Sequence, residues 1–296
     1  MKAIKKIPES DSLEIAEAWI RDTSNLVSPP DVCIKIFELM EDDAASAPAL
    51  GEIISRDTSL TARLLRIVNS PFYGFNRRID TVSRAVTVIG TSELYNLVVA
   101  VTAVTSFSRI PNFIVNIDTF WRHGICVGII ARALAKRCKI LHPERLFVAG
   151  MLHDVGSLLF FQHAPELTRE LLVSSQGNES QLARGEMQAL GFNHAQLGAM
   201  LLDTWQLPQE LTDAIRWHHE PASARSSRLE TAVLHIADAV ANHCESGAFY
   251  TTPSAQLLIH AEAWNILGLE ADDALLTEII EETRAQYRDA VNLFSS

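Results

Sequence analysis

Apolar residues recur three or four positions apart along nearly the whole chain, which is the spacing of one face of an α-helix. In the first part of the chain this pattern predicts helices over residues 10–21, 32–40, 49–55, 59–69, 81–90 and 92–107. It predicts further helices over residues 118–138, 144–163, 180–190, 194–205, 208–219, 229–244, 255–267 and 272–293. No stretch alternates apolar and polar residues over the length of a strand. We therefore expect an all-α fold.

Breaks between the predicted helices divide the chain into two halves. Residues 110–112 (Ile-Pro-Asn) form a linker, because proline interrupts regular structure. We expect a short N-terminal extension (residues 1–25), an N-terminal helical lobe (residues 26–110) and, packed on it, a second helical lobe with the C-terminal helices (residues 111–296). Phe72 and Tyr73 lie in a turn that ends a helix, and we expect them to pack between the halves rather than to present a surface to a partner. The cleft between the lobes is the expected ligand site.

Ionisable residues interrupt the apolar stripes of five predicted helices in the second half. His153 lies within such a stripe, and Asp154 follows it directly. A buried carboxylate is costly unless a cation, a metal ion or a hydrogen-bonded neighbour compensates it. The full set is His123, His153, Asp154, His194, His218, His219 and Asp238.

Taken singly, each of these residues has an ordinary structural explanation. A core histidine can bond a backbone carbonyl, and Asp238 can pair with a neighbouring histidine or arginine. As a set, imidazoles and carboxylates suit first-row metals such as iron, manganese or zinc. Seven donors exceed what one tetrahedral zinc ion requires. We therefore expect one or two divalent metal ions.

Two features of the sequence resemble a known family. Residues 51–90 (GEIISRDTSLTARLLRIVNSPFYGFNRRIDTVSRAVTVIG) resemble the N-terminal helical part of HDOD domains, bacterial relatives of the HD phosphohydrolases. The match is carried by Arg56-Asp57, Leu64-Leu65, Asn69-Ser70 and Ile89-Gly90. The order H…HD…H…HH…D is similar to the metal-ligand series of HD-type enzymes, especially the HD-GYP branch. The resemblance implies that the second lobe is HD-like and that the seven residues above are metal ligands.

Departures from the catalytic pattern argue against turnover. After the His-Asp-x-Gly sequence, HD-GYP proteins continue with a lysine, where this chain has Ser157, and serine cannot supply the charge that contacts a phosphate. The Gly-Tyr-Pro loop is replaced by Pro221-Ala222-Ser223, and Thr119 stands where some relatives place a glutamate ligand. We expect a bacterial-type signal-transduction module that acts through a signalling protein partner or a small nucleotide or phosphate ligand. The alternative is a metal-dependent phosphohydrolase acting on a nucleotide or other phosphoester.

Charge and composition narrow the possible partners and the location. The chain carries 25 Lys and Arg against 36 Asp and Glu, and its formal net charge of −11 argues against broad binding to nucleic acid or anionic membranes. Four scattered cysteines fit reduced thiols. No apolar segment follows the N-terminal lysines, and the apolar runs at residues 94–107 and 125–135 are too short to span a bilayer. We expect a cytoplasmic protein without a membrane or nucleic-acid partner.

Overall fold

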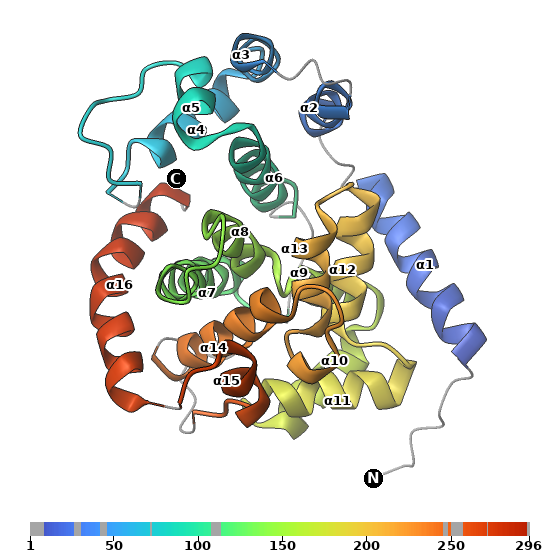
Figure 1. Cartoon of the computed structure of the whole chain (residues 1–296). Coiled ribbons are helices and arrows are strands. Elements are labelled where there is room, and N and C mark those ends of the chain that lie inside the picture. Colours follow the sequence, from blue (N-terminus) through green and yellow to red (C-terminus); the bar gives the residue numbers. More distant parts are fainter. Residues whose placement is uncertain are drawn as a thin grey trace.

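The computed structural model describes residues 9–26, 31–41, 46–71, 73–107, 114–244, 248–249, 257–270 and 272–294. Its regular elements in these ranges are all helical, so the predicted all-α fold is confirmed (Figure 1). The first half contains α2 (Asp31–Glu41), α3 (Ala47–Ser55), α4 (Thr58–Val68), α5 (Val82–Ile89) and α6 (Thr91–Phe107). The second half contains α7 (Ile117–Arg137), α8 (Glu144–Leu152), α9 (Val155–His163), α10 (Pro165–Ser175), α11 (Glu179–Leu190), α12 (His194–Thr204), α13 (Gln209–Trp217), a 3-10 turn (Pro221–Ser223), α14 (Arg228–Cys244), α15 (Ala261–Leu267) and α16 (Asp273–Phe294).

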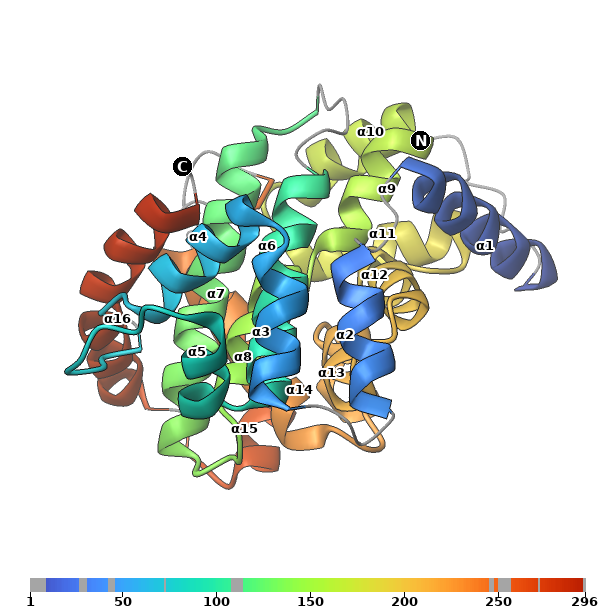
Figure 2. The ribbon, with the colours of Figure 1, turned by 90° about the horizontal axis from the view of Figure 1, so that it is seen from above.

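The two halves share one continuous apolar core. Buried side chains from both contribute to the same cluster, and α6 packs against α8 (Figure 2). Helix α1 (Glu9–Leu26) packs against α9 and α12 of the second half. The Arg132 guanidinium on α7 lies 5.5 Å from the centre of the Tyr73 ring, so Tyr73 packs between the halves as predicted. Phe72 and the predicted boundary near residue 110 lie outside the described residues, and the division into domains stays a prediction.

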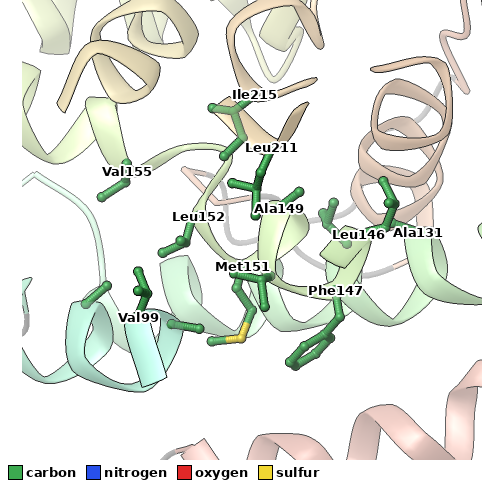
Figure 3. Close-up of a cluster of buried hydrophobic side chains, with 14 of the residues drawn as sticks. Val99, Ala131, Leu146, Phe147, Ala149, Met151, Leu152, Val155, Leu211 and Ile215 are labelled. Atoms are coloured by element: carbon green, nitrogen blue, oxygen red, sulfur yellow. The ribbon is translucent and has the colours of Figure 1, made fainter. Parts of the chain in front are cut away.

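Helix α8 is the central helix of the second half. Its residues from Leu146 to Leu152 are all buried, and it packs against α6, α7, α13 and α14. Figure 3 shows side chains of α8 among Val99 of α6 and Leu211 and Ile215 of α13. Complete burial of each large apolar side chain contributes roughly 1.5–3 kcal/mol. The C-terminal end of α8, which precedes His153 and Asp154, is therefore firmly anchored.

The single helix predicted over residues 144–163 is wrong, because the chain breaks at His153 and Asp154. Helix α8 ends at Leu152 and α9 begins at Val155. Asp154 has φ −98° and ψ 5°, which lies between the helical and extended regions and redirects the chain. The Ser157 N–H then donates to the Asp154 carbonyl at 2.8 Å and starts α9. The break places both side chains at a helix junction rather than along one helical face.

Two other helix predictions differ from the structure. Helix α10 was not predicted, although Pro165 provides a favourable helix start. Helix α15 begins at Ala261, whereas the pattern predicted a start at residue 255. His260 is extended, with φ −67° and ψ 129°, and its backbone N–H donates to His235 Nε2 at 3.0 Å. This tertiary hydrogen bond holds the segment before α15 out of the helix.

No helix in the described part of the chain is by itself long and apolar enough to cross a membrane. Helices α5 and α6 have the length and composition of a membrane span only when taken together, and the chain bends by 119° between them.

Candidate metal centre

Two glycine pairs bring the helices of the second half into close contact. Gly150 of α8 meets Gly128 of α7, and a Cβ atom added at Gly150 would run into the Gly128 backbone. Gly156 of α9 meets Gly198 of α12, and a Cβ atom added at Gly156 would run into the backbone of His194 and Gly198. Only glycine permits backbones to approach this closely. The helix junction that carries the His-Asp pair is thereby held against both α7 and α12.

All seven residues predicted from the sequence converge at this junction. Each is between 0 and 6% exposed. Their donor atoms form two groups in which the atoms lie within 4.8 Å of one another: Asp154, His194, His218 and His219 in one, and His123, His153 and Asp238 in the other. Ligands that share one ion at about 2.0–2.2 Å lie up to about 4.4 Å apart. The structure therefore brings the predicted set together at a spacing close to that of a metal centre.

Backbone and carboxylate acceptors orient three of the histidine rings. The Nδ1 atoms of His153 and His218 donate to the carbonyl oxygens of Gly150 and Ile215, both at 2.7 Å. His194 Nδ1 donates to Glu186 Oε2, also at 2.7 Å. When such a ring is neutral, a proton on Nδ1 leaves a lone pair on Nε2 for a metal ion. This is the orientation that outer hydrogen bonds impose on metal-binding histidines.

Asp154 lies between the two groups of donors. Its Oδ2 is 3.2 Å from His153 Nε2, and its Oδ1 is 3.3 Å from His194 Nε2. His194 Nε2 is in turn 2.8 Å from His219 Nε2. Two ring nitrogens this close repel unless a proton or a cation compensates their lone pairs. Each oxygen of Asp154 thus faces a different histidine, as expected of a carboxylate shared between two cation sites.

Asp238 completes the second group of donors. Its Oδ1 accepts from His123 Nε2 at 3.1 Å and lies 3.5 Å from His153 Nε2. The Asn242 side chain donates to the same oxygen at 2.9 Å. Helices α7, α14 and the α8–α9 junction therefore meet at this one carboxylate.

The buried charges of the cluster call for a cation. Burial lowers the pKa of His153, but the carboxylates of Asp154 and Asp238 outweigh burial and hold that pKa well above its usual range. Burial raises the pKa of Asp154, but His153 and His194 hold it well below its usual range. Burial and the charge on His153 lower the pKa of His218 to about 3, so His218 is neutral. A divalent ion would supply the same positive charge while leaving the ring nitrogens as ligands.

Several buried atoms that could coordinate a metal ion have no hydrogen-bond partner, so the residues fit such an ion. Within the described residues, His153 Nε2, His218 Nε2 and both Asp154 oxygens are buried without a hydrogen bond. Leaving such atoms unpaired in the interior is costly, and metal coordination removes the cost. The donor set of imidazoles and carboxylates matches iron, manganese and zinc.

Two glutamates of the centre were not predicted from the sequence. Glu186 accepts from both the backbone N–H (2.9 Å) and the Nδ1 (2.7 Å) of His194. Glu179 lies within 4.8 Å of His123 and Asp154, and burial together with Asp238 raises its pKa well above the usual range. A signal was present, because both glutamates share the buried stripe of α11 with Leu182 and Ala189.

His235 was also missed, and it has a structural role. Its Nδ1 donates to the His218 carbonyl oxygen at 2.7 Å, and its Nε2 accepts from the His260 N–H at 3.0 Å. Both ring nitrogens are thus used in fixing the chain around His218. This histidine supports the centre without offering it a donor.

Two of the positions that depart from the HD-GYP pattern are Thr119 in α7 and Ser157 in α9. Ser157 is buried, and its hydroxyl has no hydrogen-bond partner within the described residues. Glu179 brings a carboxylate to His123 from α11. Two cavities adjoin the cluster, one of about 40 Å³ beside Asp238 and one of about 210 Å³ that includes Arg184.

Comparison with known proteins establishes the family. The profile of the HDOD domain matches residues 26–221. The chain belongs to the HDOD domain family. An uncharacterized protein of Treponema pallidum (strain Nichols) is 27% identical over 194 residues, which are 64% of this HDOD chain. The matched part is 37% of that relative's own length.

Solved structures share the fold of this HDOD protein. An HDOD domain protein with unknown function from Geobacter sulfurreducens has a TM-score of 0.73 at 23% identity, covering 95% of this chain and 99% of that one. A proposed signal transduction protein of Marinobacter aquaeolei VT8 has a TM-score of 0.71 at 21% identity, covering 99% of this chain and 68% of that one. A proposed phosphohydrolase of Shewanella amazonensis SB2B has a TM-score of 0.69 at 24% identity, covering 94% of this chain and 98% of that one.

Proposed function

We propose that this HDOD protein is a non-catalytic signalling module whose core is fixed by one or two divalent metal ions. The observation that supports this proposal is that the seven donor residues are buried and that the cavities beside them are small. Seven donor residues are at most 6% exposed, and the adjoining cavities measure about 40 and 210 Å³. Binding sites for drug-sized molecules, a class that includes nucleotides, are about 300–1,000 Å³. As far as the described residues show, the centre has room for an ion but not for a phosphoester of nucleotide size.

The metal would stabilise the junction of the helices in this proposal. His123, His153 and Asp238 would form one set of ligands, and Asp154, His194, His218 and His219 the other. A bound ion acts as a Lewis acid and lowers the pKa of coordinated water. In this chain its main consequence would be free energy of folding, because the donors come together only in the native state. The fixed second half then presents a defined surface to a signalling partner.

The proposal is tested by thermal unfolding with and without added Mn²⁺, Fe²⁺ or Zn²⁺. A ligand at 100 times its dissociation constant stabilises by about 2.7 kcal/mol, which corresponds to a rise in Tm of about 5 °C for a domain of this size. We expect this rise in the native protein and its loss in Asp154→Asn. His142→Asn is the matched control, since His142 is exposed, lies outside the centre, and has a φ of 55° that asparagine tolerates.

The same samples distinguish signalling from catalysis. Phosphodiesterase and nucleotidase substrates are offered to the metal-loaded protein and to Asp154→Asn. We expect equal background rates for both. Turnover that requires Asp154 would contradict the non-catalytic role, and a Tm unchanged by any of the three metals would contradict the metal centre.

A metal-dependent phosphohydrolase is the second candidate. It is favoured by Asp154, whose two oxygens face different histidines, because two-metal sites commonly share a carboxylate and act on phosphoesters. Arg184 lines the cavity next to His219 and could attract an anionic group. Ser157 in place of lysine and the small cavities argue against this candidate.

A further inference from the structure

The first half of the chain contains a hollow that the metal centre does not use. It lies at the C-terminal end of α4, where the loop to α5 leaves the helix, and has a volume of about 1070 Å³. None of its lining residues belongs to the centre. In both views of the ribbon this loop lies at the edge of the molecule beside α16 (Figures 1 and 2). The sequence pattern alone indicated only a helix end at this position.

The Asn69 side chain holds the hollow open in one conformation. Its Nδ2 donates to the carbonyl oxygens of Leu65 at 2.7 Å and Ile79 at 2.6 Å. Its Oδ1 accepts from the Ile79 N–H at 2.7 Å. These three bonds tie the two ends of the loop together, and Ile79 is buried beneath it. The lining is thus organised before any ligand arrives, which reduces the entropic cost of binding.

The segment that forms the hollow has a charge opposite to that of the whole protein. Residues 56–84 contain six arginines and two aspartates, a net charge of +4, although the chain as a whole carries −11. Arg66 and Arg78 line the hollow, with Asp80 as the one acidic lining residue among those described. Guanidinium groups bind phosphate oxygens through paired, charge-assisted hydrogen bonds. The hollow therefore favours an anionic ligand.

Most of the remaining lining residues are apolar, and one of them is aromatic. Leu65, Pro71 and Ile79 contribute apolar surface, and Phe75 is 38% exposed. Aromatic rings stack on nucleobases, whose flat faces they match. A cavity of this size lies at the upper end of the range for small-molecule sites.

We propose that this hollow is a nucleotide-binding site, with Arg66 and Arg78 on the phosphates and Phe75 against the base. The inference is independent of the metal centre and goes beyond the proposed signalling role by giving the class of ligand. An extended nucleic acid is disfavoured, because the chain outside residues 56–84 carries a net charge of −15. Tyr73 belongs to the same loop and lies beneath Arg132 of α7, so the site is connected to the second half.

Calorimetric titration of the full chain tests this inference. The probes are ADP, pyrophosphate and adenosine, which separate the phosphate and base contributions, together with GDP and a single-stranded oligonucleotide. We expect saturable binding of ADP or GDP. Arg78→Ala should weaken it about tenfold, since one charge-assisted hydrogen bond is lost. Phe75→Ala should weaken nucleotide binding about tenfold and leave pyrophosphate binding unchanged. Both residues are exposed, so the variants should fold.

Arg84→Ala is the matched control, because Arg84 lies in the same basic segment, is exposed and does not line the hollow. We expect less than about a twofold effect on nucleotide binding. Three results would overturn the proposal: no saturable binding of ADP or GDP, equal losses in Arg84→Ala and Arg78→Ala, or tighter binding of the oligonucleotide than of either nucleotide. None of these results would contradict the proposed metal centre, since the two sites share no residue.

Discussion

A methyl group added at Gly156 tests whether α9 and α12 meet as closely as the structure shows. In Gly156→Ala the new Cβ would run into the His194 carbonyl oxygen and the Gly198 nitrogen, both of which are backbone atoms. Such overpacking costs about 3 kcal/mol when the neighbours cannot turn aside. Replacing a helical glycine by alanine returns about 1 kcal/mol. The net loss of about 2 kcal/mol should lower the Tm by about 4 °C.

The same substitution should weaken metal binding. Gly156 lies two residues after Asp154, and the backbone it would push away is that of His194, so the two ligands would be separated. Circular dichroism gives the Tm, and elemental analysis gives the metal content of the same sample. Gly185→Ala is the control, because its Cβ would meet only the flexible end of Leu171, at 2.7 Å. We expect its Tm to remain within about 2 °C of the native value. A Gly156→Ala protein with native Tm and metal content would refute the close contact.

Three further predictions concern other buried groups. Glu186→Gln should weaken metal binding about 10–100-fold in a chelator competition, because the Glu186 carboxylate accepts the hydrogen bond that orients His194. An unchanged metal affinity would contradict this orienting role of Glu186. Burial and Glu144 raise the pKa of Glu93 to about 7 from 4.5. Because the folded state binds this proton more tightly than the unfolded state does, the protein loses stability as the pH rises. The Tm should therefore fall between pH 4.5 and about 7, and the fall should be smaller in Glu93→Gln. Arg132→Ala should cost about 3 kcal/mol by urea unfolding, against less than about 1 kcal/mol for Arg137→Ala, because Arg132, which pairs with Glu144, is buried, whereas Arg137 pairs with Glu278 at the surface. Equal losses would contradict this.

The sequence was sufficient to predict the helical class and most of the helices. Apolar spacing located α7 and α14 to within one or two residues, because their buried faces are long and regular. It failed at the α8–α9 junction, where both flanking helices are buried on all sides and the apolar run continues through the break. The turn residues His153 and Asp154 are buried like the helices on either side, so no exposed loop residues mark the break. It also failed before α15, where one tertiary hydrogen bond to His235 sets the start of the helix.

The donor set was predictable because histidines and aspartates on apolar stripes are rare and costly. Their convergence could not be derived from spacing, since it depends on the contacts of Gly128 with Gly150 and of Gly156 with Gly198 between separate helices. Glu179 and Glu186 were overlooked because α11 is rich in exposed polar residues that mask its buried stripe. The acceptors that orient His153 and His218 are the backbone carbonyls of Gly150 and Ile215, which no sequence pattern reveals.

Anomalous X-ray diffraction from crystals of the metal-loaded protein tests the central claim most directly. Data collected at the absorption edges of iron, manganese and zinc locate any bound ion without assumptions about its ligands. We predict one or two peaks within about 2.5 Å of ring nitrogens and carboxylate oxygens of the seven donor residues. These are His123, His153, Asp154, His194, His218, His219 and Asp238. A metal-loaded crystal with no anomalous peak inside this cluster would contradict the account.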